Sequence, residues 1–233
     1  MDKKYVFLSY NAIKIIEIKN KTGNHMVLSG KNLAAYRNEK VLFQGLSFCL
    51  FPKQLMTITG PNGIGKSTLL RIIVGLLKAA EGYVILKDHE KTYPVSTACH
   101  YLGPQNAMKP FLSVIDNLRF WSAFYGQHLS YPHEALAEIG LSNLGLLPFN
   151  VLSTGQKRRV AIARLLLSYR PIWILDEPIS GVDSHAQTVL ANIFQHHLNQ
   201  GGIIVAATHN PLGIPENHRI TLEKFLPLEE EKE

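Results

Sequence analysis

The residues best suited to chemistry lie in the segment GPNGIGKST, at positions 60–68. Gly60, Gly65, Lys66 and Ser67 fit the pattern G-x-x-x-x-G-K-[ST], which binds nucleotide phosphates where a strand precedes it and a helix follows. The glycines let backbone N–H groups curl around a phosphate, and the start of the helix adds partial positive charge. We expect Lys66 to reach the β- and γ-phosphates of ATP and the Ser67 hydroxyl to bind Mg²⁺. The other expected ATP contacts of this loop are Pro61, Asn62, Gly63, Ile64 and Thr68.

Two carboxylates follow the bare apolar run IWIL at positions 172–175. Open sheets of parallel strands bind ligands at the edge where the carboxyl ends of the strands lie. Asp176 is therefore expected to help hold Mg²⁺, and Glu177 to orient or deprotonate an attacking water. The alternative is a surface pair that only caps a strand. The phosphate loop elsewhere in the chain disfavours that alternative.

A second candidate phosphate site lies in LSTGQKRRVAIAR, at positions 152–164. Ser153 and Thr154 are good N-cap residues, Gly155 allows close backbone approach, and the segment that follows has apolar positions three and four apart. A helix start with a free serine hydroxyl can hold a phosphate. Because this helix belongs to a helical block and not to the sheet that carries Lys66, we expect it to complete the ATP site of a second copy in a head-to-tail pair. The basic run 157–159 is interpreted as solvated, and no nucleic-acid site is expected.

The elements that must position these residues alternate between strand-like and helix-like patterns, which indicates a parallel sheet covered by helices. A helical block at about 106–168 is interpreted as an insertion that stands apart from that sheet. We expect strands at 55–60, 82–87, 171–178 and 203–209, and helices at 67–77, 113–126, 133–141, 156–167 and 184–202.

The composition describes an ordinary globular chain of 233 residues, with 46% hydrophobic residues, a formal charge of +6 and a pI near 9.2. The positive charge suits a partner that carries phosphates. Two cysteines form no framework and no metal-type spacing, which favours a reducing compartment. No apolar run approaches the roughly 18–20 residues of a spanning helix. We interpret residues 1–25 as an extension or a misassigned start, 26–226 as the regular domain, and 227–233 as a solvated acidic tail.

Together, the motifs resemble those of the ATP-binding cassette ATPases over about 26–226. GPNGIGKS is similar to their Walker A loop, IWILDE to their Walker B strand and LSTGQ, which ends at Gln156, to their signature motif. The resemblance implies that Gln105 links Mg²⁺ and the nucleophilic water to the helical subdomain, and that Asp183 in the D-loop touches the opposite site. It further implies that His209, the switch histidine, contacts the γ-phosphate.

The same resemblance implies a P-loop NTPase fold, with a parallel-sheet core, an antiparallel β region and an inserted helical subdomain, and ATP and Mg²⁺ as the bound groups. Tyr36 lies where the family often stacks an aromatic ring on adenine, although an ordinary strand-edge tyrosine is the alternative. One position departs from the pattern. Thr154 stands where most cassettes have glycine, which places a β-branched side chain beside the expected nucleotide.

Within the family, stretches such as YLGPQNAMKPFLSVIDNLRFW and GGIIVAATHNPL resemble the ATPase subunits of cytochrome c maturation (haem exporter) complexes. This implies a homodimer of ATPases on the cytoplasmic face of the bacterial inner membrane, bound peripherally to an integral subunit similar to CcmB and working with haem-handling proteins similar to CcmC and CcmE. Segment 108–112 would press on the membrane partner. The alternatives are an ATPase for lipoprotein release or a small solute, and a soluble cassette ATPase in iron–sulfur assembly.

Overall fold

Two short segments, apolar except for the terminal aspartate of the first, form neighbouring strands in a parallel sheet, β7 (Ile172–Asp176) and β8 (Ile203–Ala207). The computed structural model describes residues 26–38, 40–126 and 130–227 of the chain. In this part the sheet has five parallel strands in the order β6-β7-β8-β3-β9. The remaining strands are β3 (Leu55–Thr59), β6 (Cys99–Leu102) and β9 (His218–Thr221).

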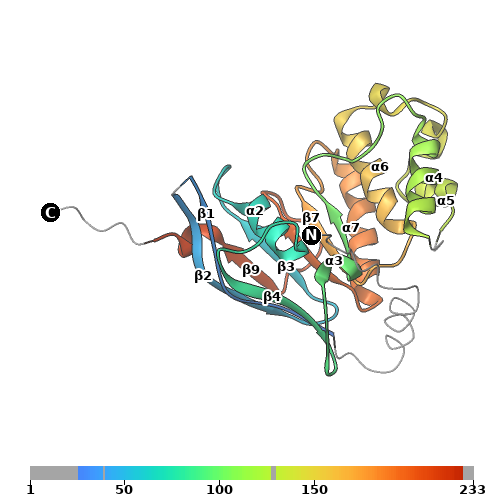
Figure 1. The fold of residues 1–233 in the computed structure, drawn as a ribbon. Coiled ribbons are helices and arrows are strands. Elements are labelled where there is room, and N and C mark those ends of the chain that lie inside the picture. The colour runs from blue at the N-terminus through green and yellow to red at the C-terminus, as the bar shows by residue number, and fades with distance from the viewer. Residues whose placement is uncertain (1–25, 39, 127–129, 228–233) are drawn as a thin grey trace, which may run out of the picture.

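A second sheet is antiparallel, with the strand order β2-β1-β4-β5. Helix α2 (Lys66–Val74) contacts both sheets, and Figure 1 shows it between them. The apolar side chains of α2 and of the two facing sheets form one buried core. The strands of this sheet are β1 (Met26–Arg37), β2 (Lys40–Leu50), β4 (Glu81–Asp88) and β5 (Lys91–Tyr93).

Alternation along the parallel strands distributes their side chains between two cores. Ile172 and Ile174 pack toward α2, whereas Trp173 and Leu175 pack on the opposite face, against α6 (Thr154–Leu166) and α7 (Ser184–Asn199). A strand that is buried on both faces must be apolar at every position, which explains the bare hydrophobic run. The shorter elements are α3 (Val95–Ala98) and the 3-10 turns Ser142–Leu144, Phe149–Val151 and Leu222–Phe225.

Three helices, α4 (Val114–Tyr125), α5 (Pro132–Glu138) and α6, form what we call the helical block, at one end of the molecule (Figure 1). The block has its own apolar core. Helix α6 belongs to two cores, because Ala161 and Leu165 pack toward the parallel sheet while Val160 and Ala163 pack within the block. None of the helices in the described ranges combines the length and the apolar character needed to cross a membrane.

The expected strands and helices are present, but α2, α5 and α7 each end three residues earlier than predicted, at Val74, Glu138 and Asn199. The helix predicted over 67–77 ends at Val74, because Gly75 adopts φ 85° and its N–H turns back to the carbonyls of Arg71 and Ile72. Leu76 and Leu77, predicted to continue the helix, are exposed. The interpretations of residues 1–25 and 228–233 concern segments outside the described residues.

Two histidines of the described ranges are buried in the core, and neither forms an ion pair there. Burial lowers the pKa of His197 to about 3, and the ring stacks on Trp173 with centroids 4.0 Å apart. Burial also lowers the pKa of His100 to about 3, and its Nε2 lies 2.8 Å from the carbonyl oxygen of Ser168. Both rings are therefore neutral in the folded protein at neutral pH.

We expect acid to destabilise the protein through these rings. An unfolded histidine titrates near 6.5, so the stability present above that pH is lost as the pH falls toward the folded pKa. His197 alone should remove about 2 kcal/mol of unfolding free energy between pH 7 and pH 5. His197→Phe keeps an aromatic ring on Trp173 and should flatten the dependence by that amount, as measured by denaturant titration at both pH values. The exposed neighbour His196, changed to Gln, is the control and should leave the slope unchanged.

Candidate active site

The phosphate loop joins β3 to α2 and has a backbone conformation that only glycine adopts easily. Gly60, Gly63 and Gly65 have φ of 143°, 82° and 119°. Helix α2 begins at Lys66 with Gly65 at its N-cap and no side-chain cap. The first N–H groups of α2 are therefore not occupied by a capping side chain, and they carry the positive end of the helix dipole. This is the geometry expected of an anion site.

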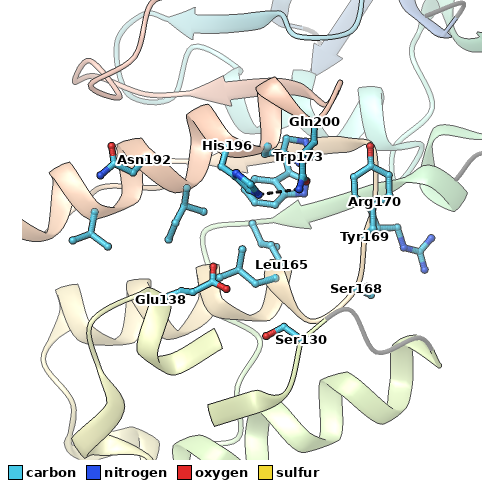
Figure 2. Close-up of a pocket in the computed structure, with 14 residues that line it drawn as sticks. Ser130, Glu138, Leu165, Ser168, Tyr169, Arg170, Trp173, Asn192, His196 and Gln200 are labelled. Carbon is cyan, nitrogen blue, oxygen red and sulfur yellow. Dashed lines mark hydrogen bonds between the residues drawn. The ribbon is translucent and has the colours of Figure 1, made fainter. Parts of the chain in front are cut away.

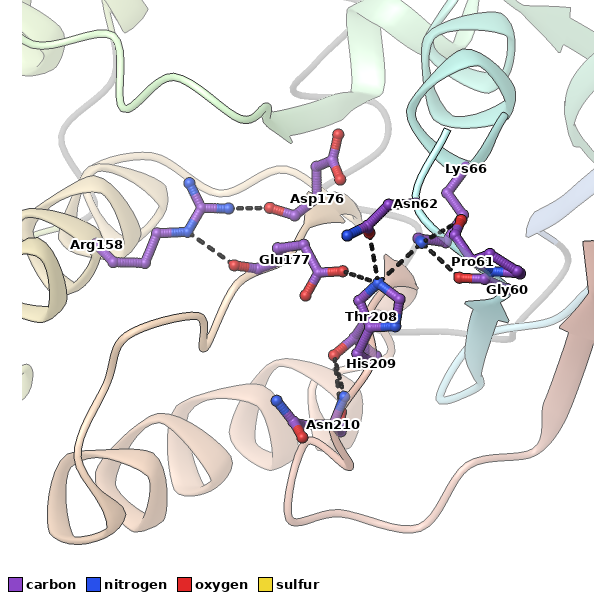
Figure 3. Close-up of polar contacts among 10 residues, drawn as sticks. All are labelled: Gly60, Pro61, Asn62, Lys66, Arg158, Asp176, Glu177, Thr208, His209 and Asn210. Atoms are coloured by element: carbon purple, nitrogen blue, oxygen red, sulfur yellow. Dashed lines mark hydrogen bonds and ion pairs between the residues drawn. The ribbon is translucent and has the colours of Figure 1, made fainter. Parts of the chain in front are cut away.

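Lys66 is buried at the mouth of this loop. Its Nζ donates to the carbonyl oxygens of Gly60 at 2.6 Å and Pro61 at 3.1 Å, and lies 3.0 Å from Nε2 of His209 (Figure 3). The acceptors around the ammonium are neutral. An anionic phosphate oxygen would bind the ammonium more strongly than these carbonyls, since charge-assisted hydrogen bonds are roughly twice as strong as neutral ones.

The predicted carboxylates lie at the carboxyl end of β7. Asp176 is buried, and its Oδ2 makes no hydrogen bond within the described ranges. Glu177 has φ 49°, a left-handed backbone conformation that is uncommon outside glycine. Its Oε1 is buried and lies 3.5 Å from His209 Nε2, too far for a strong hydrogen bond. A carboxylate oxygen is thus available on each residue.

His209 follows β8 and lies among residues from three strand ends. Its Nε2 is 3.0 Å from both Lys66 Nζ and Asn62 Oδ1. Thr208 orders the turn, because its Oγ1 donates to the carbonyl of Asn210 at 2.7 Å. The structure therefore brings Asn62, Lys66, Glu177 and His209 into one cluster, as Figure 3 shows. Their catalytic and binding roles stay predictions.

The remaining predicted residues differ in their exposure. Gln105 is exposed in the loop after β6. Tyr36, at the end of β1, is 47% exposed, and its hydroxyl donates to Glu81 at 3.1 Å, which raises the pKa of the tyrosine. Ser67 and Thr68 are half-buried in the first turn of α2. An exposed ring at Tyr36 is compatible with stacking on a base.

The signature segment begins α6 with a reciprocal cap. Ser153 Oγ accepts from the N–H of Gln156 at 3.2 Å, and Gln156 Oε1 accepts from the N–H of Ser153 at 2.9 Å. The Ser153 oxygen therefore caps α6, as expected of an N-cap residue, and the hydroxyl proton can still be donated. Thr154 is exposed, and its methyl group faces Gly181 of the same chain.

Gly155 and Gly181 are packed backbone to backbone. A Cβ added to Gly155 would lie 2.3 Å from the carbonyl oxygen of Gly181. Two residues further on, Asp183 caps α7, because its Oδ1 accepts from the N–H of Ala186 at 2.9 Å, which lowers the pKa of the carboxyl. The signature segment and the predicted D-loop are thus in direct contact within one chain.

The basic run 157–159, interpreted as solvated, contains a buried residue. Arg158 is 5% exposed, and desolvation lowers its pKa to about 10. Its guanidinium contacts the backbone of the two predicted carboxylate residues (Figure 3). The physical reason lies in helix periodicity: position 158 shares the face of 161, 162 and 165, which packs on the sheet. That spacing was the sequence signal for this residue.

A cavity of about 620 Å³ lies elsewhere, between α7 and the helical block (Figure 2). Its lining includes Leu165, Trp173, Ile193 and His196, and none of the predicted ATP or metal residues. The described residues also contain no group of three or more His, Cys, Asp or Glu side chains that could hold a metal. The cluster at the strand ends therefore remains the candidate site.

The contact between Gly155 and Gly181 generates a prediction. Gly155→Ala should push the start of α6 away from the D-loop, because a backbone oxygen cannot yield the space that a methyl group needs. We expect kcat for ATP hydrolysis to fall about 10- to 100-fold, the usual effect of misplacing reacting groups by about 1 Å. Gly145→Ala is the control, since its Cβ would make ordinary contacts with side-chain atoms of Leu136 at 3.4 Å and Ile115 at 3.9 Å. Equal activity of the two variants would contradict the prediction.

Comparison with known proteins agrees with this geometry. The ABC transporter family model matches residues 43–180. The cytochrome c biogenesis ATP-binding export protein CcmA of Bartonella quintana is 82% identical over 208 residues, 89% of this chain and 100% of the relative. The CcmA of Bartonella henselae is 83% identical over 205 residues, 88% of this chain and 99% of the relative. The CcmA of a Chelativorans species is 51% identical over 190 residues, 81% of this chain and 94% of the relative.

Solved structures show the same fold. An ABC transporter ATP-binding protein of Pyrococcus furiosus superimposes with a TM-score of 0.74 at 24% identity, covering 86% of this chain and 99% of that chain. The predicted α/β fold and the resemblance to cassette ATPases are confirmed. The chain belongs to the ABC transporter family, among the CcmA cytochrome c biogenesis ATP-binding export proteins.

Proposed function

We propose that the chain hydrolyses ATP as the nucleotide-binding subunit of a membrane complex for cytochrome c maturation, in which its turnover drives haem export or release of a haem-loaded chaperone. The observation that carries the catalytic part is the cluster of Lys66, His209 and Glu177 at the strand ends. Relatives named for cytochrome c biogenesis, with identities up to 83%, favour this role over lipoprotein release, solute transport or iron–sulfur assembly.

In this proposal ATP binds with its phosphates on the loop. The Lys66 ammonium then donates to oxygens of the γ-phosphate in place of the carbonyl oxygens of Gly60 and Pro61. The uncapped start of α2 adds N–H donors and the helix dipole. His209, already 3.0 Å from the ammonium, then lies beside the γ-phosphate. The Tyr36 ring would stack on the adenine base of ATP.

The side chains present suit Mg²⁺. The buried and unpartnered Oδ2 of Asp176 is a hard oxygen donor, and the Ser67 hydroxyl and Gln105 amide would add two more. Mg²⁺ in nucleotide enzymes typically uses one or two carboxylates together with the phosphates, so a dense acidic cluster is not required. When bound, the ion neutralises the charge that develops on the β- and γ-phosphates.

Glu177 is proposed to orient and deprotonate the attacking water. Its Oε1 lies 3.5 Å from His209 Nε2, which is itself 3.0 Å from Lys66 Nζ. Figure 3 shows the His209 ring nitrogen between the Glu177 carboxylate and the Lys66 ammonium. We propose that this carboxylate serves a water on the side of a Lys66-bound γ-phosphate from which an in-line nucleophile must approach.

We further propose that two copies form a head-to-tail pair around two ATP molecules. Helix α6 starts at the helical block, away from α2, so Ser153, Thr154, Gly155 and Gln156 suit the nucleotide of a partner chain better than their own (Figure 1). Asp183 would touch the opposite site from the same surface, because its loop packs against Gly155. Each site is then completed by the other copy.

An apolar patch on the helical block suits the membrane partner. Segments 110–114 and 147–150 are joined by backbone hydrogen bonds from Val114 to Leu147 at 2.9 Å and from Phe149 to Leu112 at 3.0 Å. Phe111 is 84% and Leu146 87% exposed at this place. Exposed apolar clusters commonly mark protein contacts. We propose that an integral subunit similar to CcmB binds here, with CcmC- and CcmE-like proteins in the same pathway, and holds the chain peripherally at the cytoplasmic face of the inner membrane.

Two substitutions test the ATPase assignment. Lys66→Ala should weaken ATP binding about 10- to 100-fold and abolish hydrolysis, because it removes charge-assisted hydrogen bonds. Glu177→Gln should bind ATP normally but turn over about 10²- to 10⁴-fold more slowly, as expected for loss of a general base. Fluorescent-nucleotide titration and phosphate release measure the two quantities. A Glu177→Gln protein that hydrolyses ATP at the normal rate would show that the catalytic assignment is wrong.

The docking patch can be tested separately. The double variant Phe111→Asp, Leu146→Asp should lose recovery in the membrane fraction, since two charges would have to be buried against an apolar partner. Its ATPase activity in detergent-free solution should stay within about threefold of normal, because the patch lies apart from the strand-end cluster. Tyr83→Asp, an exposed aromatic position on β4, is the control and should remain membrane-associated.

A further inference from the structure

Arg158, the fifth residue of α6, has a buried guanidinium, and the hydrogen bonds of that guanidinium all go to residues at or next to the carboxyl ends of β6 and β7. Arg158 Nε donates to the carbonyl oxygen of Glu177 at 3.1 Å, and Nη2 donates to the carbonyl oxygen of Asp176. Nη1 donates to the carbonyl oxygen of Gly103 at 3.0 Å and to Asn106 Oδ1 at 3.1 Å. Each of the three guanidinium nitrogens has an acceptor, and every acceptor is neutral.

The two carbonyl oxygens that Arg158 binds flank the Glu177 backbone. Glu177 is in the left-handed region with φ 49°, which a non-glycine residue keeps only when its surroundings determine it. The Glu177 N–H is held by the carbonyl of Ala207 at 2.8 Å. Arg158 fixes the carbonyl groups before and after the same Cα (Figure 3). The direction in which the Glu177 side chain leaves the strand is thereby set.

The chemistry of the side chain suits this task. A guanidinium is planar, offers five N–H donors in a fixed fork and stays charged in proteins. Burial of that charge is costly unless its donors are used. Because the hydrogen bonds go to backbone carbonyls and an amide, with no carboxylate among their acceptors, Arg158 orients the main chain and leaves the Glu177 carboxylate free for a water.

We propose that Arg158 is a positioning residue for ATP hydrolysis, which acts by holding the Glu177 main chain so that its carboxylate faces the γ-phosphate. The inference rests on the proposed role of Glu177 as the base. The same guanidinium also donates to Gly103 and Asn106, which lie on either side of Gln105 in sequence. Arg158 therefore holds both the Glu177 main chain and the loop that contains Gln105. Because Arg158 belongs to the signature helix, α6 also contacts the proposed general base, Glu177, of its own chain.

The test separates chemistry from binding in the full-length protein. Arg158→Ala should lower kcat about 10- to 100-fold, the effect of misplacing a reacting group, while ATP affinity changes less than about threefold. Arg158→Lys keeps the charge but cannot reach all of the acceptors, and should recover part of kcat. Arg159→Ala is the matched control, because the Arg159 guanidinium contacts the carbonyl of Ile139 at 3.3 Å, inside the helical block. Circular dichroism and the melting temperature confirm that each variant is folded.

A double substitution identifies the route of the effect. In the Glu177→Gln protein, Arg158→Ala should cause no further loss of single-turnover hydrolysis, since the group that it positions is already gone. Normal kcat in folded Arg158→Ala, or an equal loss in Arg159→Ala, would overturn the inference. A full additional loss in the Glu177→Gln background would also overturn it. Normal hydrolysis by Glu177→Gln alone would instead refute the proposed base, so the two failures are distinguishable.

Discussion

The candidate site depends on one constraint, the parallel direction of the buried strands β3, β7 and β8. Parallel strands end at the same edge, so three segments far apart in sequence deliver Lys66, Glu177 and His209 to one place. Their apolar side chains are buried on both faces, which fixes the register of the strands. The polar chemistry is confined to the strand ends because that is where burial stops.

Much of this arrangement could be predicted from local sequence. The runs LMTIT and IWIL carry no charged residue that would favour an exposed face, and GPNGIGKST places glycine at the three positions where the structure has positive φ. Ser153 caps α6 as expected, and α7 begins at Ser184 as predicted. In each case a few neighbouring residues determine the local conformation, which is why a pattern suffices.

What the patterns missed depends on contacts between distant segments. Strands β1 and β2 have three register shifts between them, so their alternation is broken and their apolar periodicity is weak. Arginine is usually exposed to solvent, so the residue type alone does not predict the burial of Arg158. It is buried because the loop after β6 and the end of β7 both contact its guanidinium. The end of α2 at Val74 depends on the backbone conformation of Gly75. The two leucines after Gly75 continue the apolar pattern, so the sequence predicted a longer helix.

Helix α6 lines the core of the helical block with one face and the core beneath the parallel sheet with another. If the block lost its internal packing, α6 would lose support on the side of Val160 and Ala163, and the apolar surface that it covers on the sheet would become exposed to water. Neither core can therefore melt alone at low cost. Thermal unfolding of the described region should be a single cooperative transition, even though the ribbon suggests two separable lobes (Figure 1).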